Sequence, residues 1–129
     1  MTSAYDELDD WVDANFDAQV EFLQALVRVP TDTPPGDNAL HAELTAQLLA
    51  GFGLHADRYP VPGEIAREHG LVSITNLIVR RRYSDGGPTI ALNAHGDVVP
   101  PGDGWSHDPY GAVVEAGRLY GRAAAVSKS

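Results

Sequence analysis

The sequence predicts an α/β fold in which helices pack on a mixed, largely parallel sheet. Apolar residues recur at helical spacing over the first part of the chain. Short apolar runs bounded by turn residues follow them, and one of these runs, residues 89–94, has no polar alternation at all. Such a run is typical of an interior strand that is covered on both faces. Helices followed by strands around one apolar strand favour an α/β layer.

Two amphipathic helices are predicted in the first part of the chain. The first covers residues 4–28, with Ser3 and Asp6 as a capping signal at its start, and Pro30 prevents its extension. The second covers residues 38–52. The predicted buried stripe of the first helix contains Leu8, Trp11, Val12, Phe16, Val20, Leu23, Leu26 and Val27, and that of the second contains Leu40, Leu44, Leu48 and Phe52.

The remaining elements are predicted to be short strands. Residues 54–61 and 71–83 are the first two, and a charged loop with a helical turn lies between them. Residues 89–94 follow as the central strand of the sheet. Beyond them, residues 112–115 and 118–120 predict a hairpin that turns at an Ala-Gly pair.

Composition limits the class of protein. The chain has 129 residues, which suits one domain, and its 43% hydrophobic and 21% charged residues are those of a globular protein. Nine basic and eighteen acidic side chains give a net charge of −9, which argues against nucleic acid or an anionic membrane as a partner. Because cysteine is absent, any metal site must use histidines and carboxylates. No apolar stretch is long enough to export or anchor the chain, so we expect a cytoplasmic protein.

His95 and Asp97 are the candidate site residues. They follow the apolar run directly, and in open α/β sheets ligands bind at the carboxyl ends of strands. Residues two apart in extended backbone project to the same side, so both side chains can face one cavity. A metal-binding imidazole needs an acceptor for its other N–H, which the Asp97 carboxylate can provide. The spacing alone also suits a simpler interpretation, a hydrogen-bonded histidine in a turn.

A longer set of motifs follows in order from this pair. The chain reads His-x-Asp-Val-Val-Pro from His95, then Trp105, then Asp-Pro-Tyr from Asp108, then Gly-x-Leu-Tyr-Gly-Arg from Gly117. Together these motifs resemble the zinc metallopeptidase family of aminoacylase, carboxypeptidase G and succinyl-diaminopimelate desuccinylase. The resemblance is dense over the last third of the chain and looser elsewhere. It implies the catalytic domain of a zinc exopeptidase.

The resemblance also implies roles for the two site residues. His95 corresponds to a metal ligand, and Asp97 to the catalytic carboxylate that orients it. The implied cofactor is zinc, two ions in a full-length protein, with cobalt or manganese as alternatives. The implied activity is hydrolysis of an amide bond in a small peptide or an N-acyl amino acid, and carbamoyl substrates stay open as well. A full-length relative is expected to form a homodimer, often through a lid domain.

Most of the family's metal ligands, and its general base, come after the Gly-Arg pair that ends the motif. In most relatives an aspartate that bridges two metal ions stands where this chain has Val126, and a glycine stands where it has Ala123. Either the site is degenerate or the aspartate is shifted beyond Ser129, which the retained Lys128 favours.

We therefore interpret residues 1–129 as the N-terminal part of a metallopeptidase catalytic domain, lacking the lid and the rest of that domain. By itself this part is expected to be inactive. The alternative is a truncated, non-catalytic α/β domain or a pseudoenzyme fragment without a complete metal site.

The other histidines are not expected to complete a site. His41, His55 and His69 are predicted to face solvent. His107 is predicted to be a loop residue beside a turn rather than a substrate contact, and Asp108 is expected to accept a backbone N–H in an Asx turn.

Overall fold

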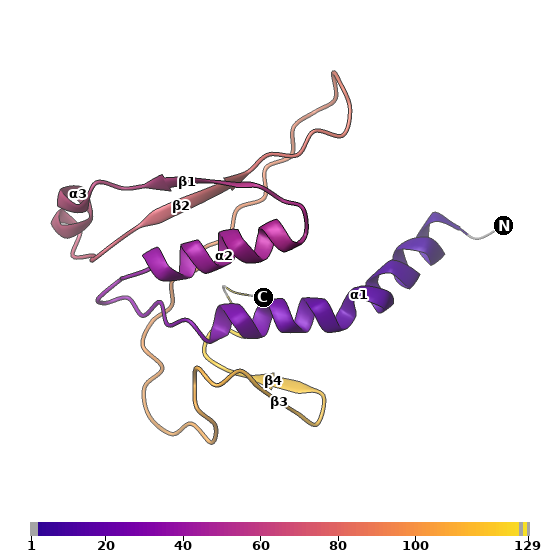
Figure 1. Cartoon of the computed structure of the whole chain (residues 1–129). Coiled ribbons are helices and arrows are strands. Elements are labelled where there is room, and N and C mark those ends of the chain that lie inside the picture. Colours follow the sequence, from indigo (N-terminus) through magenta and orange to yellow (C-terminus); the bar gives the residue numbers. More distant parts are fainter. Residues whose placement is uncertain (1–2, 127, 129) are drawn as a thin grey trace.

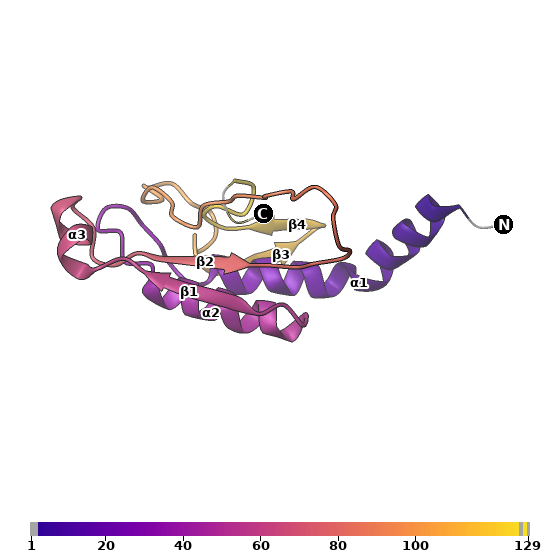
Figure 2. The same cartoon turned by 90° about the horizontal axis from the view of Figure 1, so that it is seen from above.

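The computed structural model describes residues 3–126 and residue 128. Helix α2 lies between α1 on one side and the β1–β2 pair on the other, while the N-terminal half of α1 extends away from the rest (Figure 1, Figure 2). No helix of the described residues is long and apolar enough to cross a membrane. In chain order the elements are α1 Ala4–Val27, α2 Ala39–Gly51, β1 Ala56–Pro60, α3 Gly63–Glu68, β2 Thr75–Val79, β3 Val113–Glu115 and β4 Arg118–Tyr120.

Helix α1 begins as its sequence predicts. The backbone N–H of Asp6 donates to the Ser3 hydroxyl at 3.2 Å, and the Ser3 N–H donates to the Asp6 carboxylate at 2.7 Å. This reciprocal capping box satisfies two N–H groups that the first turn leaves without partners. At the other end Leu26 and Val27 are buried. The predicted buried stripe is wrong for the first half of α1, whose apolar side chains are exposed: Tyr5, Leu8, Trp11, Val12 and Phe16. The helix packs through its C-terminal turns instead.

Helix α2 has the predicted bounds within one residue at each end, but a different face of it is buried. Its buried residues are His41, Ala42 and Ala46, whereas Leu40 is 71% exposed and Phe52 is also exposed. The predicted stripe is therefore wrong for Leu40 and Phe52, whereas Leu44 and Leu48 are half-buried. Small side chains allow close approach between packed elements, and the alanines provide this on the buried face of α2.

Both sheets have two antiparallel strands. Strand β1 pairs with β2, and the short helix α3 lies in the connection between them. Strands β3 and β4 form the predicted hairpin. Ala116 and Gly117 make its turn with φ angles of 50° and 74°, the left-handed conformation that a two-residue turn requires.

The predicted central strand, residues 89–94, is not a strand. These residues form no regular structure, and Leu92 is 95% exposed. The prediction of a largely parallel sheet is also wrong, since parallel pairing among the described residues is limited to isolated bridges at Asp32–Val98 and Asp37–Ser73. An interior strand needs neighbouring strands to pair its backbone and helices to cover its faces. The described residues place neither against residues 89–94.

The C-terminal end of α1 is the best buried part of the molecule. The Val27 side chain is fully buried against Gly121, where an added Cβ would lie 2.5 Å from Val27 Cγ1. Lys128, the single lysine of the sequence, is 8% exposed. Its ammonium donates to the carbonyls of Leu26 at 2.9 Å and Val29 at 2.8 Å. A cation at this position stabilises the negative end of the helix dipole and satisfies carbonyls that the helix leaves open.

Candidate active site

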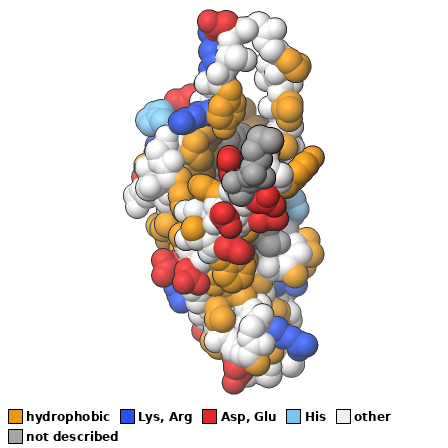
Figure 3. Space-filling view, turned by 90° about the vertical axis from the view of Figure 1, so that its right-hand side faces the viewer, with side chains coloured by type: hydrophobic (Ala, Val, Ile, Leu, Met, Phe, Trp, Pro, Cys, Tyr) orange, Lys and Arg blue, Asp and Glu red, His pale blue; other side chains and the backbone are white. Residues whose placement is uncertain are grey.

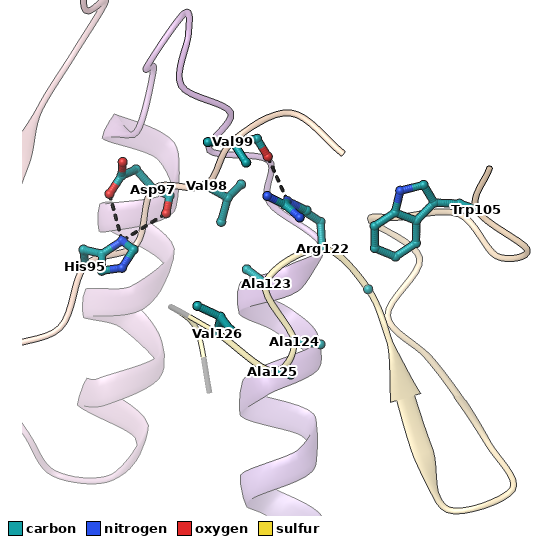
Figure 4. A pocket seen from close by; sticks show the side chains of 11 residues that line it. His95, Asp97, Val98, Val99, Trp105, Arg122, Ala123, Ala124, Ala125 and Val126 are labelled. Carbon is teal, nitrogen blue, oxygen red and sulfur yellow. Dashed lines mark hydrogen bonds and ion pairs between the residues drawn. The ribbon is translucent and has the colours of Figure 1, made fainter. Parts of the chain in front are cut away.

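His95 and Asp97 meet in the structure. His95 Nδ1 lies 3.0 Å from Asp97 Oδ1 and 3.1 Å from the Asp97 carbonyl oxygen (Figure 4). Because both oxygens are acceptors, the neutral imidazole donates from Nδ1, and the lone pair is then on Nε2. Both side chains are well exposed to solvent. The pair is thus formed as the spacing predicts, and its metal-binding and catalytic roles remain predictions.

The backbone of this segment is held by the connector between α1 and α2 instead of by a sheet. Val98 N–H donates to the Thr31 carbonyl at 3.1 Å, and Thr33 N–H donates to the Val98 carbonyl at 2.7 Å. The buried Thr31 hydroxyl donates to the Gly96 carbonyl at 2.6 Å. Sequence reasoning missed Thr31, because the turn-rich connector that contains it carries no periodic pattern.

A cleft of about 510 Å³ lies beside the pair. His95 and Asp97 line one side, and the loop of residues 123–126 lines the other, with Trp105 at the far end (Figure 4). The Arg122 guanidinium donates to the Val99 carbonyl at 2.8 Å and so joins the two sides. Val126 therefore shares a cleft with His95, but its isopropyl group cannot bind a metal.

The described residues do not by themselves form a metal site. Among residues 3–126 and 128 there is no group of three or more histidines and carboxylates that could hold a metal ion. A zinc site uses about four ligands, and a catalytic site leaves one of these positions to water. The chemistry of His95, an imidazole whose Nδ1 is held by a carboxylate, fits one ligand of such a site.

His41 is buried, so the prediction that it faces solvent is wrong. It is 7% exposed, and within the described part of the chain its Nε2 atom has no hydrogen-bond partner. Burial, together with the nearby charge of Lys128, lowers the pKa of His41 to about 4. The ring is therefore neutral at pH 7. The sequence signal for the buried face of α2 was its small residues, Ala42 next to His41 and Ala46 one turn later.

The other histidines lie where the sequence predicts. His55 and His69 are exposed. His107 does not line the cleft, and its Nε2 lies 3.4 Å from a carboxylate oxygen of Glu115. Asp108 accepts the Tyr110 backbone N–H at 2.9 Å, which confirms the Asx turn.

Tyr110 is a contact that sequence reasoning missed. Its hydroxyl donates to the Asp32 carboxylate and so links the loop after the site to the connector between α1 and α2. Burial and the neighbouring Asp32 carboxylate raise the pKa of this phenol. The two residues are 78 positions apart, and no local pattern relates them.

Comparison with known proteins gives relatives of one kind. No family model matches the chain, and no solved structure matches it significantly. The chain is 38% identical over 112 residues to the succinyl-diaminopimelate desuccinylase of Methylobacterium nodulans, which covers 85% of this chain and 26% of that protein. It is 40% identical over 107 residues to the same enzyme of Rhodopseudomonas palustris strain BisB5, a match that covers 81% of this chain and 25% of that protein. It is 35% identical over 109 residues to the enzyme of Gluconobacter oxydans, a match that covers 84% of this chain and 26% of that protein. The chain is therefore similar to the succinyl-diaminopimelate desuccinylases, and it spans about a quarter of the length of these relatives.

Proposed function

We propose that this chain forms part of a zinc-dependent amidohydrolase, to which it contributes His95 as a metal ligand and Asp97 as the carboxylate that orients it. The observation that carries the proposal is the hydrogen bond of 3.0 Å between His95 Nδ1 and Asp97 Oδ1 at the edge of a cleft. It is supported by the relatives, which are named for removing a succinyl group from succinyl-diaminopimelate. The proposed substrate is accordingly a succinylated or otherwise acylated amino acid, or a small peptide.

The geometry defines what each residue does in this proposal. The Asp97 carboxylate would fix the Nδ1–H tautomer of His95, so that Nε2 is the nitrogen that would bind a metal. A bound zinc ion would supply a water of lowered pKa and polarise the amide carbonyl, and cobalt or manganese could replace it. The other ligands and the general base would come from parts of the protein outside the described residues.

A chimeric enzyme tests the activity. Residues 1–122 of this chain would replace the matching segment of the Methylobacterium nodulans desuccinylase, joined at the Gly-Arg pair that ends the shared motif. We expect the chimera to release succinate from succinyl-diaminopimelate. His95→Ala should abolish turnover. Asp97→Asn, which keeps the shape and removes the charge, should lower kcat/KM by roughly ten- to a hundred-fold.

The exposed His69 provides the matched control, and His69→Ala should leave turnover unchanged. Full turnover in the His95→Ala chimera would contradict the proposal. Full turnover in the Asp97→Asn chimera would contradict only the role of Asp97.

A second candidate function is a non-catalytic α/β domain. It is favoured by Val126, which lines the cleft at the position where the family resemblance implies a metal-bridging aspartate, and by the lack of any group of three or more histidines and carboxylates among the described residues. A second chimera that also carries residues 123–126 of this chain tests this candidate: loss of zinc and turnover in that folded chimera, with both retained in the first, would favour it. The 129-residue chain alone should neither bind zinc tightly nor hydrolyse acyl amino acids under either proposal.

A further inference from the structure

We infer that His41 is a positioning residue, which holds the His95–Asp97 pair in its hydrogen-bonded geometry by filling the space beneath Gly96. The importance of that geometry for metal binding rests on the proposed function, whereas the geometry itself is observed. His41 belongs to α2, more than fifty positions before the pair, and is not part of the matched motifs.

The contact is direct and leaves no spare room. A Cβ added to Gly96 would lie 3.0 Å from His41 Cε1 and 3.2 Å from His41 Nδ1, which is tighter than nine in ten contacts that real Cβ atoms make. The carbonyl of the same glycine accepts the Thr31 hydroxyl at 2.6 Å. Gly96 is therefore fixed at its Cα by an imidazole ring and at its oxygen by a hydroxyl, and both side chains are buried.

The side chains of the pair are less buried than those that hold Gly96: His95 and Asp97 are 65% and 49% exposed. They flank a glycine, the residue with the greatest backbone freedom, so the backbone conformation at Gly96 sets how the two side chains approach each other. A hydrogen bond of 3.0 Å between residues two apart survives only while that backbone keeps one conformation. His41 and Thr31 supply this constraint from below.

A purely structural role for His41 makes a different prediction. If the ring only filled the core, its removal would lower the stability of the whole chain and leave the folded His95–Asp97 geometry as it is. Positioning requires that the geometry change while the chain stays folded. The tautomer of His95 reports on this geometry, because the hydrogen bond to Asp97 favours the proton on Nδ1.

The test is ¹⁵N NMR of the 129-residue chain, which reads the ratio of the Nδ1–H to the Nε2–H tautomer of His95 without metal or substrate. In the unsubstituted chain we expect Nδ1–H to dominate. In folded His41→Ala the ratio should fall at least about threefold, the size of coupling usual between residues in contact. His41→Phe should retain the ratio, because an aromatic ring still covers Gly96. His55→Ala, which removes an exposed histidine, should not change it.

A double-mutant cycle provides a second measurement and does not depend on the tautomer. Gly96→Ala should destabilise the chain in urea unfolding, because the added methyl group meets the His41 ring. The same substitution should cost less in the His41→Ala background, where that ring is absent. If His41→Ala does not fold, the tautomer ratio of His95 is measured in Gly96→Ala instead, where it should be lower than in the unsubstituted chain.

An unchanged ratio in folded His41→Ala, or in Gly96→Ala where His41→Ala fails to fold, would overturn the inference. An equal cost of Gly96→Ala in both backgrounds would overturn it as well. The proposed function can fail separately: a shifted tautomer ratio together with an inactive, zinc-loaded chimera would refute the function and leave the positioning role intact.

Discussion

His41 and Lys128 are the ionisable side chains that the described part of the chain buries. Burial lowers the pKa of His41 to about 4 and that of Lys128 to about 8, and in Lys128 the Asp32 carboxylate partly opposes the shift. Lys128 keeps its charge near neutral pH because two carbonyls accept its hydrogen bonds. His41 is neutral at pH 7, because burial and the nearby charge of Lys128 disfavour its protonated form and so lower its pKa.

The lowered pKa of His41 predicts a defined loss of stability in acid. In the unfolded chain the imidazole binds a proton near pH 6.5, whereas in the folded chain it does so near pH 4. Between these values the unfolded state holds more protons, so the free energy of unfolding falls as the pH falls through this window. His41→Phe, which cannot titrate, should remove this part of the loss. Urea unfolding at about pH 7 and about pH 4.5 measures the difference.

The matched control is His69→Phe at an exposed position, which should retain the pH dependence of the parent chain. The same fall in stability between the two pH values in His41→Phe and in the parent would contradict the assignment to His41.

Residue types and their spacing predict the His95–Asp97 pair because the contact is local, between side chains two positions apart in one extended segment. The same reasoning fails for the contacts that hold this segment. His41 and Thr31 reach Gly96 from 55 and 65 positions away, and no rule of spacing relates positions so distant. Burial of His41 was also hidden by its residue type, since histidine is fully buried less often than apolar residues are.

Elements whose stability is local were predicted well. The capping box that begins α1 and the turn residues of the β3–β4 hairpin are contained within a few residues, so the sequence indicates both. The central strand, residues 89–94, was wrong because an interior strand depends on partners elsewhere in the chain. Its apolar composition suits an interior strand, but the described residues neither pair with this segment nor cover it.

The hairpin turn offers an element-scale prediction. Ala116 adopts a φ of 50°, which costs an alanine roughly 1 kcal/mol, whereas asparagine tolerates this conformation well and Asn-Gly is the favoured pair for this turn. Ala116→Asn should therefore raise the free energy of unfolding by about 0.5–1 kcal/mol. Thermal or urea unfolding provides the measurement.

Ala116→Val serves as the opposite control, because a β-branched side chain is disfavoured at positive φ, and it should destabilise the chain. A loss of stability in Ala116→Asn equal to that in Ala116→Val would show that the turn differs from the one described.

At the scale of the whole molecule, apolar surface is left uncovered. Hydrophobic side chains lie open beside the carboxylates around the N-terminal end of the molecule (Figure 3), and the first half of α1 carries Leu8, Trp11 and Phe16 on an exposed surface. Ile90 and Leu92 are exposed in the same way. Contiguous apolar patches of this kind are rare on stable monomers and mark surfaces that another part or partner covers.

The exposed apolar surface predicts that the isolated chain associates. We expect sedimentation velocity to show oligomers that grow with protein concentration, and with added salt, because salt screens the repulsion of a net charge of −9. The variant Ile90→Ser/Leu92→Ser should associate less. A monomer at every concentration, with a sharp and reversible unfolding transition, would contradict this prediction.

The metal content of the chimeric desuccinylase is the measurement that tests the proposed role of His95 most directly. The chimera that carries residues 1–122 of this chain should purify with bound zinc, measured by atomic absorption after extensive dialysis. His95→Ala should lose zinc from one site, because it removes a ligand that the structure holds by the hydrogen bond of 3.0 Å to Asp97. His69→Ala should lose none. Full zinc content in a folded His95→Ala chimera would contradict the assignment of His95 as a metal ligand.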